Sequence, residues 1–179
     1  MEELQVIVKR AAEFGFDQAA PLDCGTIMLL PEVRDMCKTG SCGQYGKNWS
    51  CPPACGELAR CREQVSTYGT GILVQTVGKL EDSLDYEGMK EAEGRHKEAF
   101  LTMADWLRET FPDMLPLGSG CCTLCKVCSF PDAPCRFPGK RVSSMEAYGI
   151  LVSGLCEKNG VRYYYGPGTI AYTGCYLLR

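Results

Sequence analysis

Residues 69–77, GTGILVQTV, decide how the chain is expected to fold. Glycines stand at the start of this run, and its apolar centre Ile-Leu-Val is followed closely by the β-branched residues Thr and Val. β-Branched residues favour an extended backbone, and a short apolar run beside glycines is typical of a buried strand. We therefore predict a buried strand here, as part of a sheet that neighbouring segments complete.

The segments on both sides of this strand show helical spacing of apolar residues. Residues 84–111 carry an apolar stripe at intervals of three and four, which predicts the longest helix of the chain. Residues 57–68 carry a shorter stripe of the same kind. At the start of the chain, residues 1–15 predict an amphipathic helix that ends at Gly15.

Three further segments complete the predicted secondary structure. Residues 25–34 are interpreted as a strand that runs into the first cysteines. The motif VSSME contains a capping box, Ser143 with Glu146 three residues later, which predicts a helix that continues to about Asn159. The tail at residues 161–178 predicts two strands joined through a Gly-Pro-Gly turn.

Together these elements predict an α+β fold. We expect a single-domain sandwich, with a mixed sheet, flanking helices and two cysteine-rich metal-binding loops. At 179 residues the chain has the length of one domain. The predicted metal-binding domain spans residues 1–179, and its parts are a first cysteine group at 37–61, a helical scaffold at 69–111, a ferredoxin-like cysteine group at 121–135, and a C-terminal helix and hairpin at 143–178.

Composition and charge exclude several classes of partner. The net charge of −3 gives no general attraction for nucleic acid or for an anionic membrane. No apolar run approaches the roughly 18 residues that suggest a bilayer span, and the start MEELQVIVKRAAEF lacks a signal pattern. We therefore expect a cytoplasmic protein. Thiols stay reduced there, and the odd count of 13 cysteines cannot be paired completely in disulfides.

Five of the cysteines lie in the stretch GCCTLCKVCSFPDAPCR. Cys122, Cys125 and Cys128 form the spacing Cys-x2-Cys-x2-Cys, and bacterial ferredoxins use the same triple to hold an iron–sulfur cluster. Cys135 follows after six residues and is the predicted fourth ligand. Zinc is the alternative, although zinc sites usually present two separated Cys-x2-Cys pairs. Cys121 is interpreted as a non-ligand, because adjacent residues do not readily face one cluster, but the choice between Cys121 and Cys122 stays open.

The other large group lies in CKTGSCGQYGKNWSCPPACGELARC. Cys37, Cys42 and Cys51 are predicted to hold a second cluster, and Cys55 stands where a fourth ligand is needed. The stretch CPPACG is also compatible with zinc binding, so zinc stays an alternative at this site as well. Cys61 shares the apolar stripe of the predicted helix and is interpreted as a core residue. The fourth ligand is left open, and the candidates are Cys55, Cys61, Cys24 or none.

Residues other than cysteine give weaker indications of a role at these sites. His96, the only histidine, falls on the apolar stripe of the long helix and is interpreted as a core or boundary residue. Cationic residues gather around both cysteine groups, where they either raise the potential of an anionic cluster and attract an acidic redox partner, or are ordinary solvated charges. Around the second group these are Arg136, Lys140 and Arg141, and around the first Arg34, Lys38 and Lys47.

Several motifs in combination resemble a known family. VRDMC, YGKNWSCPP, GILVQ, GCCTLCKVC, PCRFP and SMEAYGI, spread over roughly residues 30–155, are similar to the predicted metal-binding family DUF2284. The resemblance implies metal binding by cysteines. Cys55 fits the family pattern poorly. The positions that the resemblance supports as ligands are Cys37, Cys42, Cys51, Cys122, Cys125, Cys128 and Cys135.

The sequence therefore predicts an iron–sulfur protein with two 4Fe-4S clusters, acting in low-potential electron transfer to a partner enzyme or within a reductase complex. Whether the chain is itself an enzyme stays open, since a cluster held by three cysteines would leave one iron free to act on a small molecule. A zinc-stabilised binding module is the second alternative. We expect a redox partner protein, without nucleic acid or membrane, and leave a homo-oligomer open. No catalytic residue is indicated.

Overall fold

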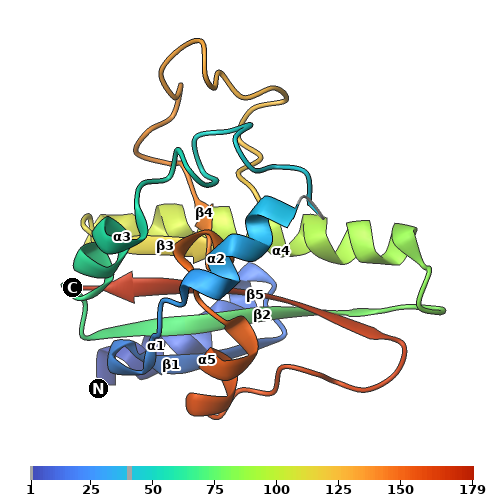
Figure 1. The fold of residues 1–179 in the computed structure, drawn as a ribbon. Coiled ribbons are helices and arrows are strands. Elements are labelled where there is room, and N and C mark those ends of the chain that lie inside the picture. The colour runs from blue at the N-terminus through green and yellow to red at the C-terminus, as the bar shows by residue number, and fades with distance from the viewer. Residues whose placement is uncertain (1, 40–41) are drawn as a thin grey trace.

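The computed structural model describes residues 2–39 and 42–179. At its centre is a five-stranded mixed sheet with the strand order β1-β2-β5-β3-β4 (Figure 1). Strands β3 and β4 are parallel, and the other neighbouring pairs are antiparallel. The strands are β1 (Gln18–Asp23), β2 (Thr70–Lys79), β3 (Leu115–Gly118), β4 (Ser143–Ser144) and β5 (Thr169–Leu178). The predicted α+β fold with a mixed sheet is confirmed.

Helices flank this sheet. The α-helices are α1 (Glu2–Arg10), α2 (Pro31–Met36), α3 (Leu58–Val65), α4 (Tyr86–Thr110) and α5 (Val152–Lys158). Short 3-10 turns are η1 (Ala11–Phe14), η2 (Cys24–Thr26), η3 (Cys37–Thr39) and η4 (Glu146–Tyr148). Within the part of the chain described, no helix combines the length and the apolar character that crossing a membrane requires.

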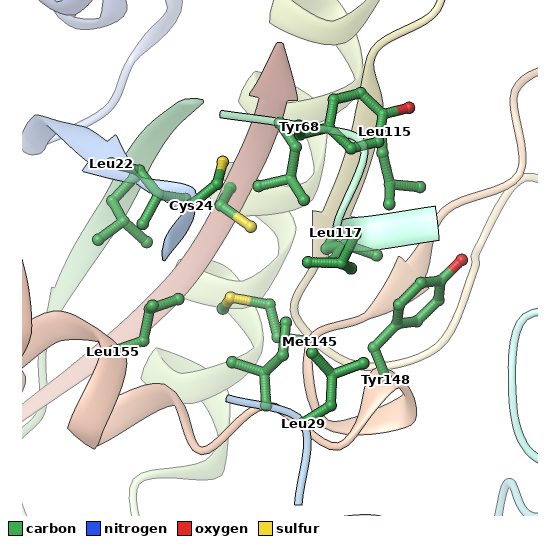
Figure 2. Close-up of a cluster of buried hydrophobic side chains, with 14 of the residues drawn as sticks. Leu22, Cys24, Leu29, Tyr68, Leu115, Leu117, Met145, Tyr148 and Leu155 are labelled. Atoms are coloured by element: carbon green, nitrogen blue, oxygen red, sulfur yellow. The ribbon is translucent and has the colours of Figure 1, made fainter. Parts of the chain in front are cut away.

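Both faces of the sheet are buried, which explains the continuous apolar run of β2. Ile72 and Val74 pack in a cluster with residues of α1 and α4, whereas Leu73 between them belongs to a cluster on the opposite face. That second cluster includes residues of α3, η4 and α5 (Figure 2). Successive side chains of a strand point to opposite faces, so one strand serves both cores. The buried strand predicted at residues 69–77 is confirmed.

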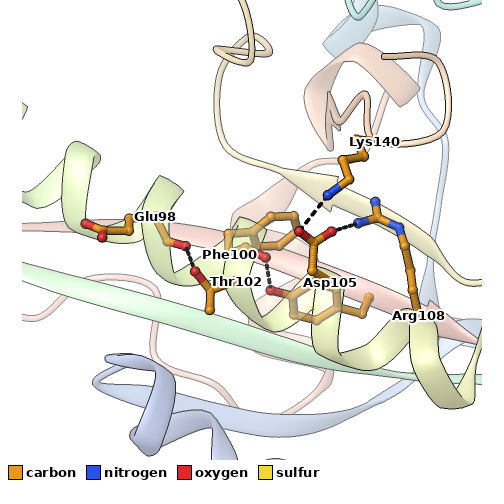
Figure 3. Close-up of polar contacts among 7 residues, drawn as sticks. Glu98, Phe100, Thr102, Asp105, Arg108 and Lys140 are labelled. Atoms are coloured by element: carbon orange, nitrogen blue, oxygen red, sulfur yellow. Dashed lines mark hydrogen bonds and ion pairs between the residues drawn. The ribbon is translucent and has the colours of Figure 1, made fainter.

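Helix α4 lies very close to strand β5. The Tyr176 hydroxyl donates a hydrogen bond of 2.8 Å to the carbonyl oxygen of Phe100, and the two rings stack with centroids 4.5 Å apart (Figure 3). A Cβ atom at Gly174 would lie only 2.5 Å from the Phe100 ring. The glycine in the strand therefore makes room for the aromatic side chain of the helix.

Three predicted elements are wrong: the strand at residues 25–34, the helix cap at Ser143 and the second strand of the tail. Residues 25–34 form η2 and then α2, because Pro31 occupies the first turn of a helix, where its missing N–H costs nothing. The first strand of the sheet is instead β1, which tolerates Pro21 because it lies at one edge of the sheet. Ser143 belongs to β4 rather than to a helix cap, and α5 begins only at Val152.

Gly149 explains the late start of α5. Its backbone is left-handed, with φ of 80°, and ends the short turn η4. The tail contains a single strand, β5, in place of the two that were predicted. By contrast, the predicted long helix agrees with α4. The predicted helix that ends at Gly15 agrees with α1 followed by η1.

His96 on α4 is part of the core, as predicted. Its side chain is 1% exposed, and its Nδ1 lies 3.1 Å from the hydroxyl of Thr76. Among the residues that the structure describes, its Nε2 has no hydrogen-bond partner. The ring packs against Phe16 and Phe100. Burial lowers the pKa of His96 to about 4, so the imidazole is neutral in the folded protein at physiological pH.

This burial makes the stability of the protein depend on pH. Between pH 6.5 and 4 the unfolded chain binds a proton at His96 that the folded chain does not. The contribution of His96 to the free energy of unfolding is therefore fully present above pH 6.5 and falls by about 3 kcal/mol as the pH drops through this window. We expect His96→Phe to remove this part of the decline, measured as the difference in thermal unfolding between the two proteins. Parallel curves of Tm against pH for the two proteins would contradict the prediction. Loss of bound metal at low pH affects both proteins equally, so it cancels in the difference.

Candidate metal centre

The two cysteine-rich segments lie together on one side of the molecule. We call residues 37–39 and 42–56 the first cysteine loop, and residues 119–142 the second. Figure 1 shows both, in cyan and orange, extending from the same side of the sheet. The second loop leaves β3 and returns to β4, which pairs with β3 in parallel, so its two ends are held by neighbouring strands.

The second cysteine loop surrounds a cavity of about 420 Å³. The four predicted ligands of this site all line it, and residues of the first loop form another part of its wall. Four cationic side chains also line the cavity, whereas its described lining includes no carboxylate or histidine. The cavity is thus sulfur-rich and electropositive. Its cysteines are Cys121, Cys122, Cys125, Cys128 and Cys135, and its cations are Lys47, Lys126, Arg136 and Arg141.

A hydrogen bond helps to close the second loop around this cavity. The guanidinium of Arg136 donates a bond of 2.8 Å to the carbonyl oxygen of Val127. Lys140, predicted to belong to the same cationic group, instead forms an ion pair of 2.9 Å with Asp105 on α4 (Figure 3). The bond from Lys140 lowers the pKa of the Asp105 carboxyl. Lys140 thereby joins the second loop to the long helix.

The first cysteine loop lines a larger cleft, of about 630 Å³. Cys37, Cys42 and Cys51, predicted to act together, all line it, and the fourth cysteine in its lining is Cys121 from the second loop. Burial raises the pKa of the Cys51 thiol, and the nearby thiols of Cys121 and Cys42 add to this effect. The carboxylate of Glu146 also lines the cleft.

Cys55 lies outside this described lining. Its sulfur is 3.8 Å from the Arg34 guanidinium and 3.8 Å from the carbonyl oxygen of Ala147. Arg34 also reaches the sulfur of Cys61 at 3.8 Å and donates a hydrogen bond to the carbonyl of Gly56. Burial raises the pKa of Cys55 to about 11. Cys55 and Cys61 are therefore grouped around one arginine.

The remaining cysteine candidates lie in the core. Cys61 is 2% exposed and packs in the cluster on the α3 face, as its position on the helical stripe predicted. Cys24 belongs to the same cluster (Figure 2). Burial, reinforced by the Asp23 carboxylate, raises the pKa of the Cys24 thiol to about 12.

Ser50 and Trp49, just before Cys51, join the two loops, and Asn48 supports Ser50; the sequence pattern predicted no role for these three residues. The N–H of Cys122 donates a 3.0 Å hydrogen bond to the hydroxyl of Ser50, which donates in turn to the Asn48 side chain at 2.6 Å. Both Ser50 and Asn48 are buried. Trp49 donates through its indole N–H to the carbonyl of Ala133 at 3.0 Å. The sequence signal for this contact is the polar pair Asn48 and Ser50 on either side of Trp49, within YGKNWSCPP.

No group of three or more histidine, cysteine or acidic side chains within residues 2–39 and 42–179 is arranged to hold a single metal ion. The fold and the two loops define a cysteine-rich α+β protein whose thiols line two neighbouring hollows. The chain belongs to DUF2284, the family of predicted metal-binding proteins, whose model matches residues 20–178. This confirms the resemblance found in the sequence. Neither the curated proteins nor the solved structures contain a match.

Proposed function

We propose that the protein holds two 4Fe-4S clusters and transfers electrons at low potential to a partner enzyme or reductase complex. The observation that carries the proposal is the cavity of the second loop, with its five cysteines, four cations and no described carboxylate. Cys122, Cys125, Cys128 and Cys135 would hold one cluster there. Cys37, Cys42 and Cys51 would hold the other, with a fourth ligand considered below.

The size of the cavity supports a cluster over a single zinc ion. Zinc binds sulfur at about 2.3 Å, so tetrahedral geometry requires the four sulfurs to lie about 4 Å from one another. Thiols that line a hollow of about 420 Å³ leave room for a polynuclear group. All thirteen cysteines are free thiols in the structure, which suits the same chemistry and a reducing compartment such as the cytoplasm.

The charges around the cavity support the same conclusion. A 4Fe-4S cluster with four thiolates carries net negative charge and supplies one-electron transfer when bound. The side chains of Lys47, Lys126, Arg136 and Arg141 line the cavity and would offset that charge. Positive charge near a cluster favours its reduced form and so raises its reduction potential relative to the same cluster without such charges. The contrast with the first cleft, where Glu146 lies, suggests that the two sites differ in potential.

The surface of the second loop suits a protein partner. Val127 is 76% exposed and Phe137 is 45% exposed, and the neighbouring side chains of Lys126 and Arg136 are also exposed. Apolar side chains next to cations fit a partner with an acidic rim around an apolar patch. Docking there would bring the partner to the cavity of the second loop.

A second candidate is a redox enzyme that acts on a small molecule in the first cleft. The cleft favours it because it extends from the thiols past Glu146 to Leu151 and Tyr163, and its volume is about 630 Å³. Pockets of this size hold small molecules. This enzymatic function requires a cluster with only three thiolates at the first site, so it depends on whether a fourth cysteine ligand exists there.

Counting metal and sulfide tests the proposal. After purification without oxygen, we expect about eight iron atoms and eight acid-labile sulfides per chain, the content of two 4Fe-4S clusters. We also expect a brown protein that dithionite bleaches. A colourless protein that contains zinc at both cysteine sites and no sulfide would overturn the proposal. It would support the zinc-stabilised binding module.

A further inference from the structure

We propose that Cys121 supplies the fourth thiolate of the first site, so that the adjacent residues Cys121 and Cys122 bind different clusters. This inference rests on the proposed iron–sulfur function and deepens it. The first cleft is lined by four cysteines, three from the first loop and Cys121 from the second. The site is thus built from two loops that are far apart in the sequence.

The local backbone explains how two adjacent cysteines serve two sites. Gly120 has a left-handed backbone with φ of 69°, which turns the chain directly before Cys121. The N–H of Cys122 is then fixed by its bond to the buried hydroxyl of Ser50. Of the two cysteines, Cys121 lines the first cleft as well as the cavity of the second loop, whereas the cleft lining does not include Cys122. Cys121 therefore lies at the boundary between the two hollows.

Cys55, the ligand suggested by spacing, already has other contacts. Its sulfur lies between the Arg34 guanidinium and the carbonyl of Ala147, at 3.8 Å from each. Arg34 is held there by its bond to Gly56 and by its approach to Cys61. To reach the cleft, Cys55 would have to leave this cation, whereas Cys121 already lines it. The contacts of Cys55 thus fit a structural role in joining the end of the first cysteine loop to α2 and η4.

The assignment has two consequences for the proposed sites. Each cluster receives four thiolates, which removes the open iron that the small-molecule enzyme would need. The two clusters are also joined by the single peptide bond between Cys121 and Cys122, in addition to the Ser50 hydrogen bond. The electron-carrier function is therefore favoured over the enzyme.

Two alanine variants test the inference on the intact, iron-loaded protein. We expect Cys121→Ala to lose about four of the eight iron atoms, or to convert one cluster to a three-iron form with a distinct paramagnetic resonance spectrum. The matched control, Cys55→Ala, should keep the full iron and sulfide content and unchanged spectra. If Cys55→Ala loses a cluster and Cys121→Ala keeps both, the inference is overturned while the proposed function stands. A wild-type protein without iron and sulfide would overturn the proposed function itself.

A labelling measurement keeps the inference testable if Cys121→Ala fails to fold. When the wild-type protein is treated with iodoacetamide in the absence of oxygen, we expect bound metal to protect Cys121 from alkylation. Chelation of the metal should expose it together with Cys37, Cys42 and Cys51. Labelling of Cys121 at equal rates before and after chelation would contradict its role as a ligand.

Discussion

Removal of the metal is expected to make residues 35–56 and 118–140 sensitive to proteases, while the sheet and α4 stay resistant. The described parts of these segments hold few regular elements and are joined mainly by Ser50 and Trp49. Metal binding to such loops contributes folding free energy directly. Because each loss of about 1.4 kcal/mol raises the open population tenfold, we expect cleavage there to accelerate at least tenfold.

Limited proteolysis followed by mass spectrometry, with and without a chelator, measures this effect on one protein sample. Residues 70–79 and 86–110 provide the internal control, because β2 and α4 belong to the packed core and should resist cleavage in both states. Equal cleavage rates in the two loops with and without metal would show that the loops are ordered by protein contacts alone.

Replacing Gly149 by alanine is expected to destabilise the protein strongly. Its φ of 80° disfavours any side chain, and an added Cβ would lie 2.8 Å from the carbonyl oxygen of Leu30. The amide of Leu30 also donates a 2.7 Å hydrogen bond to Gly149, so the clash falls at the start of α2. We expect the free energy of unfolding to fall by about 2–4 kcal/mol and Tm by roughly 4–16 °C. Since α2 leads to Cys37, the metal content of the first site should fall as well.

Gly154 is the matched control for this substitution. It lies inside α5, where an added Cβ would meet Leu151 at an ordinary contact distance of 3.6 Å. Alanine stabilises a helix interior by up to about 1 kcal/mol relative to glycine, so Gly154→Ala should raise Tm by a few degrees. A similar loss in both variants would show that the conformation of Gly149 has no special importance.

The strongly patterned elements could be predicted from the sequence, and the weakly patterned ones could not. The apolar run of β2 and the long stripe of α4 each carry a clear signal, because both faces of β2 and one face of α4 are buried. Strand β1, QAAPLD, has no such signal, since an edge strand with a proline needs little apolar surface. Helix α2 was hidden by the apolar run TIMLL before it, and only Pro31 marked its start.

The candidate site could likewise be predicted from the sequence only in part. Local spacing was enough to group Cys122, Cys125 and Cys128, and these three line one cavity. The approach of Cys121 to the first cleft depends on how the second loop packs on the first, which no local pattern encodes. From the sequence alone, the adjacency of Cys121 and Cys122 argues against Cys121 as a ligand. That argument concerns two ligands of one cluster, and it would not apply to two residues that bind different clusters, as proposed for Cys121 and Cys122.

The position of β5 in the sheet has a consequence for the order of events in the cell. This strand lies between β2 and β3, so the platform that carries both cysteine loops cannot close until Leu178 has left the ribosome. Cys37 is made 141 residues earlier (178 − 37), which corresponds to about 7–28 s of synthesis. Metal delivery is therefore expected to be post-translational.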